Sequence, residues 1–476
     1  MTIQLALTLP GGVALGAFEA GALAALVVAV GDLCEGDEPQ ACVDLIGASS
    51  AGALTSVLVA RALLDGLDPV DLLRRAWVEE ASLPALLQAA SGRAPLSGES
   101  LRRLAGTFLH TPGKPTGRRQ SVPITVSVAL TNLRGLAYRT TAGAAPVVTY
   151  LDWGDFTAIP GPGGVRFETP SGAPMIELVL ASAANPVGFL PRLLTRSPDE
   201  AVENFPETKA FWYADGSLLK RKPLGRTMRL ARARGGAGRR VHLVLEPLPV
   251  AVSHGRSWAD PATPPTWIAT LRRSVQIMDA QSILDDVRES HEVNERCRAV
   301  EVLARHLEGL DEHSREEVRA ALGRAVAELG GAPTGDIADA LARAAGVVSR
   351  REMPIELISP DLVPGVREIG AHQALAGDFL FRFGGLLDPA LRQSDFDLGY
   401  SSALAWLDER RLERYGLPAD AADKASRAAY EAYRPGDTRR AGDSRVRSLP
   451  WRGRLAAARL VARMGYVAAR DTLVRR

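Results

Sequence analysis

A serine surrounded by very small residues lies within Asp44–Leu54, whose sequence is DLIGASSAGAL. An apolar, strand-like stretch leads into it, and a helical pattern begins directly after it. This arrangement is typical of a nucleophile elbow, a strained strand-to-helix turn that projects a serine hydroxyl and admits only small neighbours. Neither Ser49 nor Ser50 matches the strict pattern G-x-S-x-G. We favour Ser50, because Gly52 then lies where the helix packs on the strand and Ala48 is the small residue before the turn. Taken alone, the segment also fits a junction without catalysis.

A glycine-rich turn precedes this serine, in the segment Leu9–Gly16 with the sequence LPGGVALG. A turn of this kind between a strand and a helix directs backbone N–H groups and the positive helix end toward one point, which favours an anion. Taken alone, it also fits a tight turn without a binding role. A dinucleotide-binding enzyme is the last of the hypotheses, because Val13 occupies the second glycine position of G-x-G-x-x-G and Asp44 lies inside the expected second strand.

Four segments of the chain, in the same order, resemble the motifs of the patatin-like phospholipases. Residues 11–21 resemble the glycine-rich oxyanion loop of that family, and residues 47–54 resemble its nucleophile elbow. Residues 181–191, ASAANPVGFLP, resemble its A-S-x-A-x-P-x-x-F-x-P segment, and Tyr213–Ser217 resembles its D-G-[GA] motif. The tail segment 383–400 is similar to C-terminal regions of bacterial patatin-related proteins.

The resemblance implies a lipid acyl hydrolase with Ser50 as nucleophile and Asp215 as its base, working without a cofactor or a metal. Asp215 would accept the serine proton, and the acyl-serine intermediate would then be hydrolysed by water. The substrate would be a carboxylic ester of a phospholipid or of another acyl lipid. Backbone N–H groups of the glycine turn and of the helix after the serine would stabilise the oxyanion. The residues expected to form this hole or to contact substrate are Gly11, Gly12, Val13, Ala14, Gly16 and Ala51.

Four positions depart from the family's pattern. Val13 stands where a third glycine is usual, and Leu15 stands where a basic residue is usual. Ala48 replaces the first elbow glycine, and Ser217 ends the D-G motif where glycine or alanine is usual. Because backbone N–H groups do not depend on the side chain, we expect catalysis despite these changes. The departures also motivate a second hypothesis, a non-catalytic patatin-like scaffold that binds lipid or a partner.

An esterase of the α/β-hydrolase type is a third hypothesis. Its triad follows the chain order Ser, Asp, His, so the base would be His242 or His254. His242 falls within an expected strand, where a packed or surface histidine is the simpler interpretation. His254 lies in a proline-rich segment and is the better candidate of the two.

Short apolar stretches alternate with helical patterns in the first half of the chain. This order predicts an α/β fold with a mostly parallel central sheet covered by helices. Residues 1–250 are expected to form the catalytic domain, 251–265 a proline-rich linker, and 266–476 a mainly helical region with one further strand within 353–362. A stretch at 151–174 is a candidate lid or pocket wall. The expected strands are 3–9, 42–46, 122–130 and 240–246, and the expected early helices are 16–30 and 51–64.

The balance of charges, the few cysteines and the N-terminal sequence indicate which partners and which cellular compartment to expect. The 476 residues include 57 basic and 55 acidic ones, so no global field attracts nucleic acid. Cys34, Cys42 and Cys297 give neither a disulfide framework nor metal-ligand spacing. The N-terminus lacks the basic segment of a signal peptide, and the apolar run 20–30 is too short to span a membrane. We therefore expect a cytoplasmic protein, and its oligomeric state stays open.

The last 26 residues predict an amphipathic helix. Apolar residues recur at steps of three or four beside a row of arginines, which suits peripheral contact with an anionic membrane. The alternative is that the apolar face packs on the body of the protein while the arginines are solvated. The apolar positions are Trp451, Leu455, Ala458, Ala462, Tyr466, Ala469 and Leu473, and the arginines are Arg452, Arg459, Arg463 and Arg470.

Overall fold

The structure is a computed structural model of the 476-residue chain. It describes residues 2–34, 39–88, 92–110, 113–138, 146–198, 202–203, 205–234, 239–248, 287–288, 291–328, 336–347, 352–380, 382–436 and 449–474. The expected linker 251–265 and His254 lie outside the described residues. The division into two regions at that linker therefore stays a prediction.

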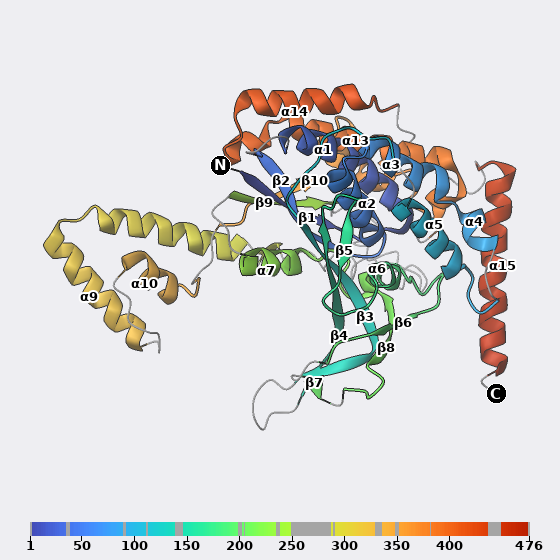
Figure 1. Ribbon diagram of the computed structural model, residues 1–476, viewed down its shortest axis with the longest axis horizontal. Coiled ribbons are helices and arrows are strands. Elements are labelled where there is room, and N and C mark those ends of the chain that lie inside the picture. Colours follow the sequence, from blue (N-terminus) through green and yellow to red (C-terminus); the bar gives the residue numbers. More distant parts are fainter. Residues whose placement is uncertain are drawn as a thin grey trace, which may run out of the picture.

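A ten-stranded mixed sheet lies at the centre of the protein (Figure 1). Its main path is β10-β9-β1-β2-β3-β4-β5, while β7 and β8 pair with β3, and β6 pairs with β8. Neighbouring strands from β10 to β3 are parallel, and all other pairs are antiparallel. The strands are β1 (Ile3–Leu9), β2 (Ala41–Ala48), β3 (Ile124–Tyr138), β4 (Val147–Ile159), β5 (Arg166–Glu168), β6 (Arg192–Thr195), β7 (Val202–Glu203), β8 (Ala210–Asp215), β9 (Arg239–Leu245) and β10 (Ile355–Ile358).

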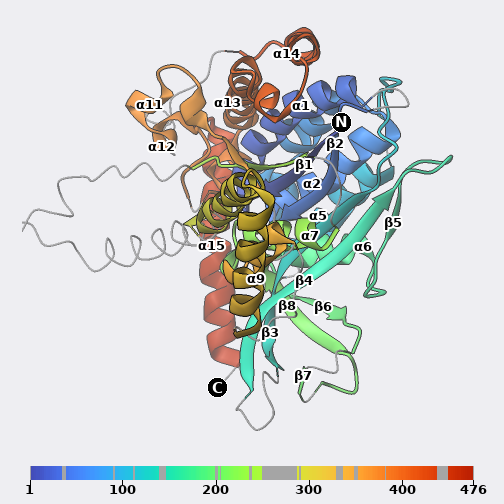
Figure 2. The ribbon, with the colours of Figure 1, turned by 90° about the vertical axis from the view of Figure 1, so that its left-hand side faces the viewer.

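Helices cover the sheet and form most of the second half of the chain (Figures 1 and 2). A further helix spans residues 291–308. The labelled α-helices are α1 (Gly16–Leu33), α2 (Ala51–Asp65), α3 (Pro69–Arg74), α4 (Leu83–Gln88), α5 (Gly98–His110), α6 (Met175–Ser182), α7 (Leu224–Arg234), α9 (Glu312–Glu328), α10 (Ile337–Ala344), α11 (Val366–Ile369), α12 (Ala371–Ala374), α13 (Pro389–Asp408), α14 (Ala419–Ala432) and α15 (Trp451–Val474). The short 3-10 turns used below are η1 (Val13–Leu15), η3 (Gly216–Leu218) and η6 (Gly384–Leu387).

The side chains of β1 show how the two faces of the sheet are covered. Leu5, Leu7 and Leu9 point into the main core with residues of α1, α2, α13 and α14. Ala6 points to the opposite face and packs with Leu224 and other residues of α7. Because side chains alternate along a strand, a strand that is apolar at every position is buried on both faces. The central strands are therefore enclosed between two helical layers.

The central part of the fold confirms the α/β prediction. The expected strands 3–9, 42–46 and 240–246 and the helix 51–64 lie at β1, β2, β9 and α2 with ends shifted by two residues at most. The further strand expected within 353–362 is β10, which extends the sheet beside β9. This strand and α13, which packs against α1, place part of the helical region 266–476 in the same core as the first 250 residues.

Two expectations about the chain's apolar and loop segments were wrong. The stretch 151–174 is not a lid, because most of it is β4 and β5, and Phe156 of β4 is fully buried in the main core. The apolar run 20–30 belongs to a longer helical stretch, Val13–Leu33, which is long and apolar enough to cross a membrane. Most of that stretch is buried inside the fold, as in the core helix of a globular domain. Small residues let α1 approach its neighbours closely, and this explains its composition.

The strand β3 positions the ends of two other strands. Its Val128 pairs with Ala48 at the end of the parallel strand β2. Two residues farther on, Leu130 pairs with Asp215 at the end of the antiparallel strand β8. Since β4 pairs along the other edge of β3 from Ile124 onward, β2 and β8 share one edge and meet end to end. The loops that follow these two strands are therefore brought together.

Candidate active site

Ser50 occupies a strained turn between β2 and α2. Its φ is 51° and its ψ is −118°, a combination that non-glycine residues rarely adopt. The turn is held by Ser49, whose N–H donates to the Leu9 carbonyl at 3.1 Å. The Ser50 N–H donates to Ser182 Oγ at 3.0 Å. A Cβ atom on Gly52 would lie 2.6 Å from the Leu9 oxygen, so only glycine fits there. This is the geometry expected of a nucleophile elbow.

Asp215 lies directly beside this serine. Ser50 Oγ donates to Asp215 Oδ2 at 2.7 Å, across a sequence separation of 165 residues. Both side chains are buried, with Asp215 fully so and Ser50 4% exposed. The backbone of Asp215 is fixed on two sides, because its N–H donates to the Ala184 carbonyl and its carbonyl accepts from Thr131 Oγ1. The two residues that the sequence singled out are thus in direct contact.

The surroundings of Asp215 make its carboxylate a better base. Burial raises the pKa of Asp215 to about 6, and hydrogen bonds from Ser50, Ser217 and Asn185 partly oppose this rise. The backbone N–H of Ser217 is one of these donors, at 2.8 Å from Asp215 Oδ1. A carboxylate with a pKa near 6 remains ionised at neutral pH and accepts a proton more readily than an exposed aspartate. The arrangement can therefore deprotonate the serine hydroxyl.

Three of the expected N–H donors in the glycine turn are already used inside the protein. The Gly11 N–H donates to the Arg221 carbonyl at 3.0 Å, and Arg221 Nε returns a bond to the Gly11 carbonyl at 2.7 Å. The Ala14 N–H donates to the Arg382 carbonyl at 3.1 Å. The Gly16 N–H bonds within η1. These three residues therefore shape the turn, and the expectation that they donate to an oxyanion is corrected.

The other three expected donors remain available. Within the described residues, no internal acceptor bonds the N–H groups of Gly12, Val13 or Ala51. Val13 and Ala51 line the same cavity as Ser50. Val13 also has a φ of 51°, a strained value for a branched residue. Two adjacent N–H groups of the glycine turn and the first N–H group of α2 thus form the candidate oxyanion hole.

A largely apolar cavity opens at Ser50. It measures about 980 Å³ including its open mouth, and its walls come from α2, α5, α6 and the segment around η6. Leu58 of α2 and Phe108 of α5 are among the residues that line it, and Asn185 is one of its few polar side chains. A cavity with such walls suits a hydrocarbon chain whose ester group reaches Ser50.

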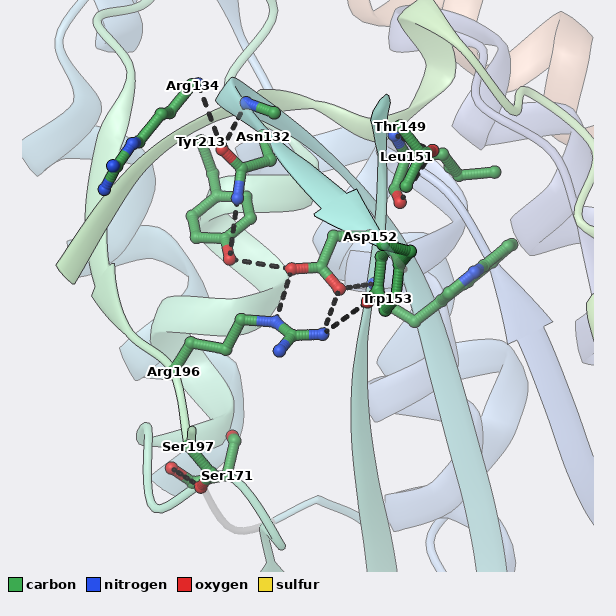
Figure 3. A network of polar contacts seen from close by, with 12 residues as sticks. Asn132, Arg134, Thr149, Leu151, Asp152, Trp153, Ser171, Arg196, Ser197 and Tyr213 are labelled. Carbon is green, nitrogen blue, oxygen red and sulfur yellow. Dashed lines mark hydrogen bonds and ion pairs between the residues drawn. The ribbon is translucent and has the colours of Figure 1, made fainter. Parts of the chain in front are cut away.

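A largely buried polar network joins Tyr213 of β8 to β3 and β4 (Figure 3). Asp152 of β4 accepts hydrogen bonds from the Tyr213 hydroxyl at 2.8 Å and from Arg196 Nε at 2.9 Å. Asn132 of β3 also donates to the Tyr213 hydroxyl, at 3.4 Å. Because Tyr213 precedes Asp215 by two residues, this network ties the strand that carries the carboxylate to β3 and β4.

His242 does not contact the dyad. It is fully buried in β9, which lies two strands away from β2, and burial lowers its pKa to about 3. Within the described residues neither of its ring nitrogens has a hydrogen-bond partner. It is therefore a packed histidine, as expected from its strand. In the same described part of the chain, no group of three or more His, Cys, Asp or Glu residues is arranged to hold a metal.

Ser182 and Asn185 are two site residues to which the sequence alone gave no role. Ser182 accepts from the Ser50 N–H and donates to the Ala129 carbonyl at 2.8 Å, so it links the elbow to β3. Asn185 bonds Asp215 and lines the cavity. Both lie in the segment 181–191, whose resemblance to a family motif was the available signal. The motif marked the segment, and the contacts assign the roles.

The comparisons with known proteins agree with this geometry. Residues 7–226 match the family model described as patatin-like phospholipase. These residues form a patatin-like phospholipase domain. They contain the elbow, the glycine turn and Asp215. Proteins with a patatin-like domain are generally lipid acyl hydrolases.

The other comparisons add little. VipD from Legionella pneumophila aligns with 98% of this chain and 91% of its own, at 12% sequence identity and a TM-score of 0.20. A likeness of that size supports no conclusion about function. No curated protein matches the chain. The patatin-like domain is therefore assigned from the family model and from the observed sheet and site.

The Ser217 hydroxyl offers a test of how the patatin-like site sets the pKa of Asp215. We expect Ser217→Ala to raise that pKa above about 6, because it removes a hydrogen bond that favours the ionised carboxylate. The base must be ionised, so the acidic limb of the kcat/KM profile for ester hydrolysis should move to higher pH by about 0.5 to 1 unit. The exposed Ser197 gives a control, and Ser197→Ala should leave the profile in place. An acidic limb that stays put or moves to lower pH in Ser217→Ala would contradict this account.

Proposed function

We propose that this protein is a serine lipid acyl hydrolase that cleaves carboxylic esters of phospholipids or other acyl lipids. The observation that carries the proposal is the 2.7 Å contact between Ser50 Oγ and the buried carboxylate of Asp215. The membership of residues 7–226 in the patatin-like domain family supports lipid acyl hydrolysis in general. The apolar cavity at Ser50 supports an acyl chain as the group that is bound.

In the proposed mechanism, Ser50 Oγ attacks the ester carbonyl while its proton passes to Asp215. The carbonyl oxygen becomes an oxyanion, which the N–H groups of Gly12, Val13 and Ala51 stabilise. The intermediate collapses, the C–O bond breaks, and the alcohol leaves with the proton from Asp215. Water then attacks the acyl-serine, giving its proton to Asp215, and the fatty acid is released as Ser50 recovers a proton. The reaction consumes one water molecule and needs no cofactor.

The reactivity of Ser50 provides the first test. We expect a fluorophosphonate probe to label the wild-type protein at Ser50, because the probe reacts with an activated serine held beside an oxyanion hole. Ser50→Ala should remove both the labelling and the hydrolysis of phospholipid or nitrophenyl esters. Asp215→Asn should lower kcat by at least about 10³-fold, because it removes the base while keeping the shape. Mass spectrometry of the labelled peptide and a lipid-release assay measure these effects.

The histidine variants separate the dyad from a triad. His242→Ala and His254→Ala should both keep the burst of acyl-enzyme, and loss of the burst in either would favour the α/β-hydrolase hypothesis. Folded wild-type protein that the probe does not label would favour the non-catalytic scaffold. Asp215→Asn should also raise the free energy of unfolding at neutral pH. The buried charge that it removes is unfavourable to the native state.

The cavity makes a prediction about acyl-chain length. Ala105 of α5 lines the cavity, so Ala105→Phe should fill part of it and exclude long chains. We expect kcat/KM for a hexadecanoyl ester to fall by about 10-fold or more, while that for a butanoyl ester changes little. Gly106→Ala is the matched control, because a Cβ atom there would meet nothing within 4 Å. An equal loss for both esters would argue that the cavity does not hold the acyl chain.

We further propose that α15 brings the protein to an anionic membrane surface in the cytoplasm. One face of this helix packs on the body through Ala456, Ala457 and Leu460. On the opposite face, Trp451 is 63% exposed and Tyr466 is 62% exposed. The expected apolar stripe is thus exposed at its described positions, Trp451, Leu455, Ala458, Ala462, Tyr466 and Ala469.

The arginines of α15 divide into two groups. Arg452, Arg454 and Arg459 are exposed beside the apolar stripe, which favours contact with anionic headgroups. Arg463 and Arg470 are partly buried and donate to the carbonyls of Leu87 and Gly92, so they fasten the helix to the body. The side chain of Leu473 lies outside the described residues.

Vesicle sedimentation tests this surface. In a Ser50→Ala background, which leaves the lipid intact, we expect the double variant Leu455→Gln with Tyr466→Gln to bind anionic vesicles several-fold less than its parent. Binding by the parent should also weaken as salt is raised. Leu303→Gln changes an apolar side chain that is 50% exposed on the distant helix 291–308 and should leave binding unchanged. Equal binding by the double variant and its parent would remove the membrane role of α15.

A further inference from the structure

A segment from the C-terminal part of the chain forms one side of the candidate active site. The Arg382 carbonyl accepts the Ala14 N–H at 3.1 Å, and this is a bond to the glycine turn itself. A Cβ atom on Gly385 would lie only 2.8 Å from Ala14 Cβ, so the two backbones approach closely. Phe383 and Leu386 of the same segment line the cavity beside Ser50. Residues 376–380 and 382–387, here together called the buttress segment, thus support the turn from outside the patatin-like domain.

Two buried side chains of α13 hold the buttress segment at its two ends. Asp395 Oδ1 accepts the Ala376 N–H at 2.7 Å, and its Oδ2 accepts the Gly377 N–H at 3.0 Å. Arg392 donates from one nitrogen to the Gly385 carbonyl at 2.9 Å. Its Nε donates to the Val78 carbonyl at 2.9 Å, next to Trp77 of the cavity wall. Asp395 is fully buried and Arg392 is 1% exposed, so water does not replace these bonds.

The helix α13 is itself fixed against α1, the helix that follows the glycine turn. A Cβ atom on Gly21 of α1 would lie 1.9 Å from the Phe396 oxygen, and one on Gly399 would lie 2.0 Å from the Phe18 oxygen. The two helices therefore touch backbone to backbone near Asp395. The glycine turn is therefore connected to the buttress segment in two ways. One is the direct bond at Ala14, and the other runs through α1 and α13.

The glycine turn needs such support because it is strained. Val13 has a φ of 51°, and the buttress segment contains two further non-glycine residues with positive φ, Leu380 at 50° and Arg382 at 69°. Conformations of this kind cost about 1–3 kcal/mol each and persist only where the surroundings fix them. The Ala14 N–H belongs to the peptide that follows Val13, so its bond to Arg382 sets the ψ of Val13. Because Val13 is fixed in this way, the Arg382 carbonyl also helps to set the orientation of the Val13 N–H group.

We propose that Asp395 and Arg392 are positioning residues that hold the buttress segment so that the Gly12 and Val13 N–H groups face the oxyanion. This inference rests on the proposed hydrolase function. Among the described residues, no hydrogen bond joins either side chain to Ser50, to Asp215 or to the cavity lining, and the two act through the Arg382 carbonyl. An oxyanion hole is used mainly in the transition state, so a displaced turn lowers kcat and leaves substrate binding largely unchanged.

The experiment compares Asp395→Asn and Arg392→Gln with the wild-type protein. Asp395→Asn keeps the shape of the side chain and removes one acceptor, while Arg392→Gln shortens the side chain and removes the guanidinium bonds to the Val78 and Gly385 carbonyls. We expect kcat for ester hydrolysis to fall by about 10- to 100-fold, with KM changed by less than about threefold. Asp397→Asn is the matched control, because Asp397 is a buried acid of the same helix that bonds Gln393 and Tyr433 instead. It should lower the melting temperature while leaving kcat within about twofold of wild type.

Amide hydrogen exchange gives a second measurement that does not need activity. In Asp395→Asn, peptides covering residues 11–17 should exchange faster, while peptides covering β2 and β3 stay unchanged. Unchanged kcat together with unchanged exchange at 11–17 would overturn the proposal, and so would equal losses of kcat in Asp395→Asn and Asp397→Asn. If the wild-type protein hydrolyses no ester, the proposed function fails, and the exchange data still decide whether α13 holds the turn.

Discussion

The site depends on one constraint, the single edge of β3 that two strands of opposite direction share. β2 pairs with this edge up to Val128, and β8 pairs with it from Leu130 to Asn132. Their ends therefore face each other across one residue, Ala129, whose carbonyl accepts Ser182 Oγ. Hydrogen bonding along β3 thus brings Ser50 and Asp215 within 2.7 Å although they are 165 residues apart. Any change in the register of either strand would separate them.

Burial and backbone strain at the site follow from this same arrangement. A carboxylate without solvent is unfavourable, and the raised pKa of Asp215 has this burial as its main cause. Ser50 adds a strained φ of 51°, which is held by bonds from Ser49 and Ser50 to Leu9 and Ser182. The packing of the sheet against its two helical layers offsets the cost of the buried Asp215 carboxylate and of the strained Ser50 backbone. As a result, the fold itself holds the Ser50 hydroxyl and the Asp215 carboxylate in direct hydrogen-bond contact.

Local patterns in the sequence predicted the central fold and pointed to Ser50, and the resemblance to a family motif pointed to Asp215. The strands β1, β2 and β9 are short apolar runs bounded by breakers, and Ser50 and Asp215 lie in recognisable motifs. The antiparallel strands β4 to β8 were not predicted, because each is short or has a partly exposed face and so lacks the buried apolar run of the central strands. Of the six residues expected at an oxyanion hole, three have an N–H group without an internal acceptor among the described residues. Whether an N–H group is free depends on acceptors such as Arg382, which lies more than 350 residues beyond the turn.

The departures of the glycine turn from its family pattern have a common physical reason in this fold. Leu15, where a basic residue is usual, is fully buried and packs in one cluster with Leu375 and Leu398 from the C-terminal region. Val13, where a glycine is usual, packs against a second cluster that includes Phe383 and Leu386. A charge at position 15 would be buried without water among apolar side chains, which is strongly unfavourable. The two apolar residues instead join the turn to the C-terminal region, so the turn and the buttress segment depend on each other for their conformation.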